Sequence, residues 1–320
     1  MKQIGLICKK KTQFIVEFEE FLISKNIKVV CVRQKSNLFL PSFVSKFFFN
    51  KEISKLSEKN LIVSFVPDAK ADVYFYDSSF SKIAKSAELL KYAQKVIVQI
   101  KRDKYELASQ RIMNENNIQI VYPSWTNFEC DTQLIKEKYF KQFQIEEHNT
   151  KIITHISNNL QKSGVGEFLE IISSLNSENF VAIIAVPQKQ KMQLDFVLSS
   201  FKSSKNIKSV EILCDEDTKQ LLAISDIFVY PAKSKQFANI VLLAMGLKNA
   251  VFVTSVNKAS EIVDYFATIQ GQHDTSTGHK IDALLCSEDL EMIKIQNHEM
   301  VLEYEQTKTF EKIYNILETL

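Results

Sequence analysis

The stretch DIFVYPAKSKQFANIVLLAMGLKNA, residues 226–250, decides the fold. Its first apolar run is short enough for a buried strand and stops at Pro231. Its second apolar run follows a polar turn through Lys235, is long enough for a helix, and closes at Gly246. We therefore predict a strand, a loop and a helix. Because ligands bind at the carboxyl ends of strands in an open α/β sheet, part of any ligand should lie over loop 232–238.

Short apolar runs alternate with amphipathic segments on both sides of this stretch, and each run is a candidate strand. In the first part of the chain the candidate strands are 4–8, 27–32, 61–65, 73–76, 95–100 and 118–122. In the second part they are 151–156, 180–186, 208–213 and 250–254, in addition to the strand in the quoted stretch. The polar segment 144–150 divides the two series. The alternation predicts two doubly wound, Rossmann-like α/β domains facing a cleft, residues 1–146 and 147–296.

Composition bounds the class of protein. The 320 residues carry a net charge of +2, which is not the electrostatic footprint of a nucleic-acid-binding protein. The 5 cysteines have no metal or redox spacing, so we expect free thiols in a reducing compartment. The amino terminus lacks the apolar core of a signal peptide, and no apolar run approaches the roughly 20 residues of a membrane span. We expect a cytoplasmic protein, at most peripheral to the inner face of a membrane. The many Phe and few Gly suggest an AT-rich bacterial genome.

One loop has the chemistry of a phosphate-binding site. The sequence SNNLQKSG, residues 157–164, lies between a predicted strand and a predicted helix that begins near Val165. Free backbone donors at a helix amino end, together with Lys162, suit a diphosphate. A plain helix cap would have the same composition, so both interpretations stay open.

Two basic segments also allow more than one interpretation. Lys9, Lys10 and Lys11 stand where a glycine-rich turn would follow the first strand, which excludes a dinucleotide-binding fingerprint. The triple lysine is either a solvated loop or a contact for an anionic acceptor. Segment 43–56, rich in Phe and Lys, is either a core helix or a surface that docks on a membrane.

Near the carboxyl end, a helix is expected at 259–265 and a long polar loop at 270–280. His273 and His279 flank Asp274 in that loop, but no third ligand follows at a fixed spacing. We therefore expect neither a metal site nor a bound cofactor.

The second half resembles the carboxyl-terminal half of the retaining glycosyltransferases of the GT-B fold, family four, which includes bacterial lipopolysaccharide, capsule and glycolipid enzymes. The matching segments are VEIL (210–213), DTKQLL (217–222), SDIFVYPA (225–232), residues 237–246, VFVTS (251–255) and EIVD (261–264). The segment VYPS (121–124) stands where the family ends its first domain. The resemblance implies sugar transfer with retention, from a nucleotide-sugar to a glycan or lipid-linked acceptor, without a metal. It also implies that a final helix, 297–320, packs back on the first domain.

The resemblance places the donor site on two loops. The implied donor-binding residues are Asn158, Lys162, Ser163, Gly164, Lys233, Lys235, Phe237, Ala238 and Asn239. The family's arginine falls near Asn158 and its lysine at Ser163, one residue from Lys162. The one candidate catalytic residue is Asp77, which follows strand 73–76 and is expected to contact an acceptor hydroxyl.

The two glutamates that hold the donor in this family fall on Lys235 and Leu243. An ammonium group only donates hydrogen bonds, and a leucine forms none, so neither side chain can accept from sugar hydroxyls. Three accounts remain open. The protein is an active, divergent transferase in which Lys233 and Lys235 pair with the diphosphate or with a donor sugar that carries a carboxylate. Alternatively, it is a catalytically degenerate accessory or sugar-binding partner of a second glycosyltransferase, or it binds another nucleotide-linked ligand.

Overall fold

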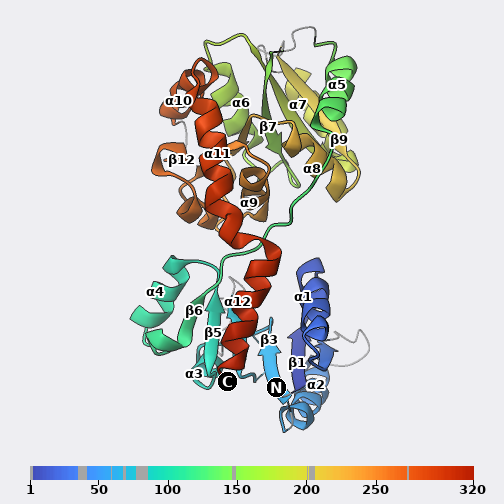
Figure 1. Ribbon diagram of the computed structural model, residues 1–320, viewed down its shortest axis with the longest axis vertical. Coiled ribbons are helices and arrows are strands. Elements are labelled where there is room, and N and C mark those ends of the chain that lie inside the picture. Colours follow the sequence, from blue (N-terminus) through green and yellow to red (C-terminus); the bar gives the residue numbers. More distant parts are fainter. Residues whose placement is uncertain are drawn as a thin grey trace. The chain divides into compact units, whose positions relative to one another are not determined.

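The computed structural model describes residues 3–34, 42–58, 60–67, 70–76, 86–145, 149–199, 201, 206–271 and 274–320. The chain divides into two compact units, Met1–Pro123 with Gln306–Leu320, and Ser124–Glu305. Each unit contains a six-stranded parallel sheet with helices on both faces (Figure 1). The predicted fold class, two doubly wound α/β domains, is confirmed. None of the described helices has both the length and the apolar character of a membrane span.

In the first unit the strand order is β2-β1-β3-β4-β5-β6. The strands are β1 (Gln3–Cys8), β2 (Val29–Arg33), β3 (Asn60–Ser64), β4 (Val73–Tyr76), β5 (Lys95–Val98) and β6 (Ile118–Ile120). The helices are α1 (Gln13–Ser24), α2 (Ser42–Ser57), α3 (Ser86–Lys91), α4 (Lys101–Ser109), the 3₁₀ helix η2 (Glu115–Asn117) and α12 (Gln306–Glu318).

The last helix of the chain completes the core of this first unit. Phe310, Ile313 and Leu317 recur on one face of α12 at helical spacing and are buried against α1 and the sheet. The other face of the sheet buries Phe49 and Ile53 of α2. These two contacts support the core-helix interpretation of segment 43–56, although the side chains of residues 42–48 lie outside the description.

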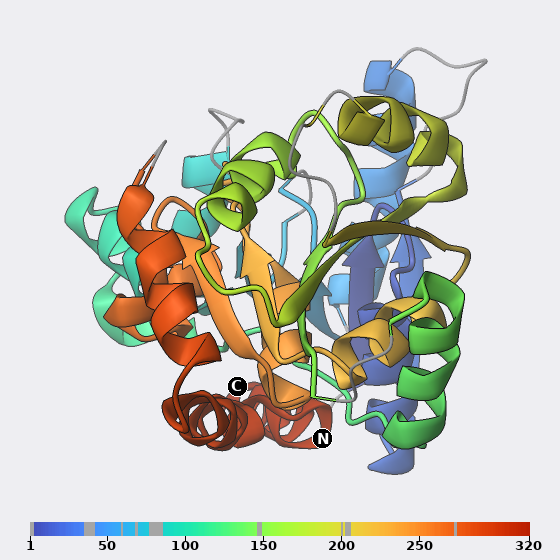
Figure 2. The ribbon, with the colours of Figure 1, turned by 90° about the horizontal axis from the view of Figure 1, so that it is seen from above.

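In the second unit the strand order is β12-β11-β10-β7-β8-β9. The strands are β7 (Lys151–Ile156), β8 (Phe180–Pro187), β9 (Ile207–Ile212), β10 (Ile227–Tyr230), β11 (Ala250–Thr254) and β12 (Thr268–Ile269). The helices are α5 (Thr132–Phe143), α6 (Val165–Ser173), α7 (Gln188–Ser199), α8 (Asp215–Ala223), α9 (Asn239–Gly246), α10 (Thr275–Leu285) and α11 (Asp289–Val301), with the 3₁₀ helices η3 (Lys258–Ile262), η4 (Tyr265–Ala267) and η5 (Leu302–Tyr304). Figure 2 shows α6 and α11 on opposite sides of this sheet.

The strand order reverses at β7. The chain runs from β7 outward to β8 and β9, and then returns to place β10 on the other side of β7, with Ile227 paired to Ile153. The loops that follow β7 and β10 therefore lie side by side at the carboxyl edge of the sheet. This is the topological switch point at which open α/β sheets bind ligands.

Three segments differ from the sequence-based expectation. The division between the units falls at Pro123 rather than at 146, because α5 packs on α8 and buries Ile135 and Tyr139 within the second unit. The helix expected at 259–265 is two short 3₁₀ helices. The polar loop expected at 270–280 becomes helical from Thr275, and α10 packs against α6.

The single tryptophan of the chain packs tightly inside the second unit. Trp125 is buried, and its Nε1 donates to the carbonyl oxygen of Val301 over 2.8 Å. Its ring lies against the end of α9, where a Cβ on Gly246 would come within 2.4 Å of Trp125 Cε3. Only glycine fits at this position without a shift of the ring.

Candidate functional site

The two loops at the switch point touch each other. Gly164, the N-cap of α6, has a left-handed backbone with φ of 82°. A Cβ there would come within 2.5 Å of the Pro231 carbonyl oxygen, which belongs to the loop after β10. Glycine is needed for both reasons, because a side chain would strain the backbone and meet a carbonyl that cannot move aside. The loops 157–164 and 231–238 form one surface at this contact.

The first loop presents polar groups at the amino end of α6. The hydroxyls of Ser157 and Ser163 are buried and have no hydrogen-bond partner among the described residues. Asn158 and Lys162 are exposed on the same loop. The first N–H groups of a helix lack intrahelical partners, and no side chain of Gly164 caps them. The loop thus combines backbone donors, two hydroxyls and an ammonium group, as an anion requires.

Gln190 of α7 fixes the shape of this loop. Its Oε1 accepts from the Leu160 backbone N–H over 3.0 Å, and its Nε2 donates to the Asn158 carbonyl over 2.9 Å. Sequence reasoning missed this residue, because it lies 30 positions away on another helix.

The second loop, residues 231–238, is held by hydrogen bonds from the end of β11 and the turn that follows it. Thr254 Oγ1 donates to the Ala232 carbonyl over 2.6 Å, and Asn257 Nδ2 donates to the Ser234 carbonyl over 3.0 Å. Asn257 Oδ1 accepts from the Ala238 N–H over 3.3 Å. Both side chains are buried. They were not among the residues predicted from the sequence, although polar residues at the end of an apolar strand and shortly after it are a signal for such a role.

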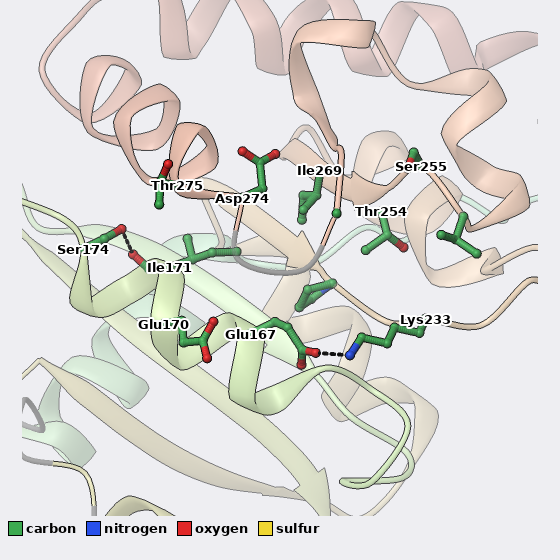
Figure 3. A pocket seen from close by; sticks show the side chains of 13 residues that line it. Glu167, Glu170, Ile171, Ser174, Lys233, Thr254, Ser255, Ile269, Asp274 and Thr275 are labelled. Carbon is green, nitrogen blue, oxygen red and sulfur yellow. Dashed lines mark hydrogen bonds and ion pairs between the residues drawn. The ribbon is translucent and has the colours of Figure 1, made fainter.

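The predicted residues of the second loop have different environments. Lys233 Nζ lies 2.6 Å from Glu167 Oε1 of α6, so this lysine is already in an ion pair (Figure 3). Lys235 is exposed, whereas Phe237 and Ala238 are half-buried. Asn239 is exposed at the first position of α9. The structure therefore brings all the predicted donor residues to one edge of the sheet, with Lys235 better placed than Lys233 to meet a ligand.

A neutral histidine lies behind the first loop. His155 of β7 is fully buried, with its ring stacked 5.1 Å from that of Phe168, and burial lowers its pKa to about 4. Its Nδ1 lies 3.0 Å from the Val229 carbonyl oxygen, so Nδ1 carries the proton. The Nε2 atom is then an acceptor, and it has no partner among the described residues.

The remaining sequence candidates lie outside the described residues or belong to the first unit. Asp77 lies outside the described residues, as does His273. Lys11 forms an ion pair with Glu19, whereas Lys9 and Lys10 are exposed. Within the described ranges, no group of three or more His, Cys, Asp or Glu side chains could hold a metal ion.

Neither a protein-family model nor a curated protein sequence matches the chain. Solved structures do. A glycosyltransferase from Rickettsia africae is 14% identical with a TM-score of 0.77, over 99% of this chain and 98% of that one. Anabaena Alr3699/HepE in complex with UDP and glucose is 12% identical with a TM-score of 0.74, over 99% and 100%. WaaG, a glycosyltransferase involved in lipopolysaccharide biosynthesis, is 12% identical with a TM-score of 0.68, over 98% and 99%. These likenesses establish the fold, and the predicted GT-B fold is confirmed.

Proposed function

We propose that this protein transfers a sugar from a nucleotide-sugar donor to a glycan or glycolipid acceptor, with retention of configuration. The observation that carries the proposal is loop 157–164, which contains the exposed Lys162 and the buried hydroxyls of Ser157 and Ser163 and leads into the amino end of α6. A buried hydroxyl without a partner costs about 1–3 kcal/mol, which a phosphate oxygen would offset. The fold shared with HepE, a protein crystallised with UDP-glucose, supports a nucleotide-sugar as the source of that phosphate.

In this proposal the protein acts mainly on the leaving group. Cleavage of the bond between sugar and diphosphate places negative charge on the diphosphate oxygens. The N–H groups of α6 and the ammonium group of Lys162 stabilise that charge, and preorganised donors of this kind are commonly the largest protein contribution. The left-handed Gly164 lets the loop after β10 lie directly against the amino end of α6. No metal takes part.

The sugar itself is recognised differently from the family pattern. No Asp or Glu lies between Asp226 and Glu261, so the loop offers no carboxylate to the hydroxyls of a neutral sugar. Lys235 is exposed on this loop, and it would pair with a donor sugar that carries its own carboxylate. We therefore propose an acidic sugar donor as the first class to test.

The same absence of carboxylates favours a second candidate function. A protein that keeps the fold but not the sugar-holding glutamates would serve as a partner of a second, complete glycosyltransferase. In either role the acceptor would be a cell-surface glycan or its lipid-linked precursor, such as lipopolysaccharide, at the inner face of a bacterial membrane. It would contact the first unit at the exposed Lys9 and Lys10.

A transfer assay separates these functions. The full chain is incubated with uridine, guanosine, cytidine and adenosine diphosphate sugars and with a membrane extract, and the products are identified by mass spectrometry. Transfer by the protein alone supports the enzyme, and NMR of the new anomeric proton tests retention. Transfer only after addition of a co-purifying glycosyltransferase supports the partner role. If no nucleotide-sugar binds, the enzyme is refuted. If the co-purifying glycosyltransferase is equally active with and without this protein, the partner role is refuted.

A further inference from the structure

Apart from the proposed diphosphate site, the second unit contains a cavity beside α6. It occupies about 460 Å³ between α6 and α10, above the ends of β10 and β11 (Figure 3). Pro231 belongs both to its wall and to loop 231–238. The cavity is lined neither by residues 157–164 nor by Lys235, so it is separate from the proposed diphosphate site.

The packing of the two helices keeps this cavity open. Just beyond α6, Asn176 and Ser177 donate backbone N–H groups to the Asp282 carboxylate of α10 over 2.7 and 3.0 Å. At Gly278 the helices are so close that a Cβ would come within 2.1 Å of Ser174 Oγ. The helices are therefore clamped at one end, and the cavity fills the space between their other ends.

The lining is apolar at its base and acidic at its sides. Ile171, Pro231 and Ile269 are buried side chains of the wall. Glu167 and Glu170 stand one helical turn apart on α6, and Asp274 adds a third carboxylate. Among the described residues of the lining, these three carboxylates face one ammonium group, that of Lys233, which gives a formal charge of −2.

We infer that this cavity is a small-molecule site that takes a ligand with a compact apolar body and an ammonium group. The apolar body would cover Ile171 and Ile269, and the ammonium group would lie against the carboxylates of α6. A carboxylate-bearing ligand would be repelled by the same groups. The inference stands independently of sugar transfer, because no residue of loop 157–164 takes part.

A ligand bound in this cavity would also affect loop 231–238. Lys233 lies in the lining and pairs with Glu167, so a ligand ammonium beside Glu167 would compete for that carboxylate. The Lys233 ammonium group would then lose its ion pair with Glu167 and turn away from α6. Ligand binding should therefore change the affinity for a nucleoside diphosphate, and by linkage the diphosphate should change the affinity for the amine by the same factor.

The experiment uses three probes that share a cyclohexyl ring, cyclohexylamine, cyclohexanol and cyclohexanecarboxylate, titrated into the full chain by isothermal calorimetry. The amine should bind at least about tenfold more tightly than the carboxylate, with the alcohol between them. Glu170→Gln keeps the shape of the wall and should weaken the amine about tenfold while leaving the alcohol unchanged. Glu178→Gln, an exposed glutamate of the same unit outside the lining, is the matched control and should change neither.

Three results would overturn the inference. The first is no binding of the amine, the second is equal affinity for amine and carboxylate, and the third is an equal loss of amine affinity in Glu170→Gln and Glu178→Gln. Circular dichroism of each variant verifies folding before titration. Because the titration contains no nucleotide, its failure would leave the proposed transfer untouched, and a failed transfer assay would leave this site untouched.

Discussion

Gly164→Ala is predicted to destabilise the second unit strongly. The alanine would have to adopt the left-handed backbone conformation of residue 164, with φ of 82°, which costs about 1–2 kcal/mol. It would also meet the Pro231 carbonyl oxygen at 2.5 Å, and overpacking of this kind costs about 1–3 kcal/mol more. The sum is a loss of about 2–5 kcal/mol in the free energy of unfolding of the unit.

Gly166→Ala is the matched control, two residues further along α6. A Cβ at Gly166 would meet nothing within 4 Å, and the residue lies inside the helix. Alanine is the better helix former, so this variant should gain about 0.5 kcal/mol. The same chemical change is thus expected to act in opposite directions at two neighbouring positions.

The chain carries its own probe for this comparison. Trp125 is the single tryptophan and is buried in the second unit, so its fluorescence reports the unfolding of that unit in urea. With a slope on the order of 2 kcal/mol/M, Gly164→Ala should lower the midpoint by about 1–2.5 M and Gly166→Ala should raise it slightly. Equal midpoints for the two variants would refute the contact between Gly164 and Pro231.

Three further outcomes are expected. Gly246→Ala should lower the free energy of unfolding of the second unit by about 1–3 kcal/mol, measured by the same fluorescence, because its Cβ would meet the Trp125 ring at 2.4 Å; an unchanged midpoint would contradict that packing. His155 should make the unit acid-sensitive, because burial holds its folded-state pKa at about 4, below the ordinary value of about 6.5. As pH falls from about 6.5 to 4, the unfolded state therefore binds the proton first, and the free energy of unfolding drops by up to about 3 kcal/mol. His155→Leu should flatten the dependence of this free energy on pH. An identical pH dependence in the variant would count against a role of His155. Lys162→Ala should weaken nucleoside diphosphate binding about tenfold or more in calorimetry, with Lys189→Ala of α7 as the control, and equal affinities for the two variants would remove Lys162 from the site.

The strands and the switch point could be predicted from the sequence, because a strand that is buried on both faces appears as a continuous apolar run. The run from Ile227 to Tyr230 is buried on both faces of its sheet and appears as a continuous apolar segment. The same reasoning failed at α10, whose first turn is Thr275, Ser276 and Thr277. These residues favour loops by intrinsic propensity, but Asp274 caps the helix and its packing on α6 decides the structure.

The supports of the candidate site could not be predicted, because they act across long stretches of sequence. Gln190 and Asn257 hold loops that lie about 20 to 30 positions before them, and neither is part of a recognisable motif. That the Ser157 hydroxyl is buried and has no partner within the described part of the chain becomes apparent only from the structure. Residue type alone therefore located the loops, whereas their shape depends on tertiary hydrogen bonds.

The central claim is that loop 157–164 binds the diphosphate of a nucleotide-sugar. The most direct test is calorimetric titration of the full chain with the uridine, guanosine, cytidine and adenosine diphosphate sugars, each as a neutral and an acidic sugar where available. The account predicts that at least one binds and that the matching free nucleoside diphosphate competes with it at the same site. No binding by any of the nucleotide-sugars would contradict the claim.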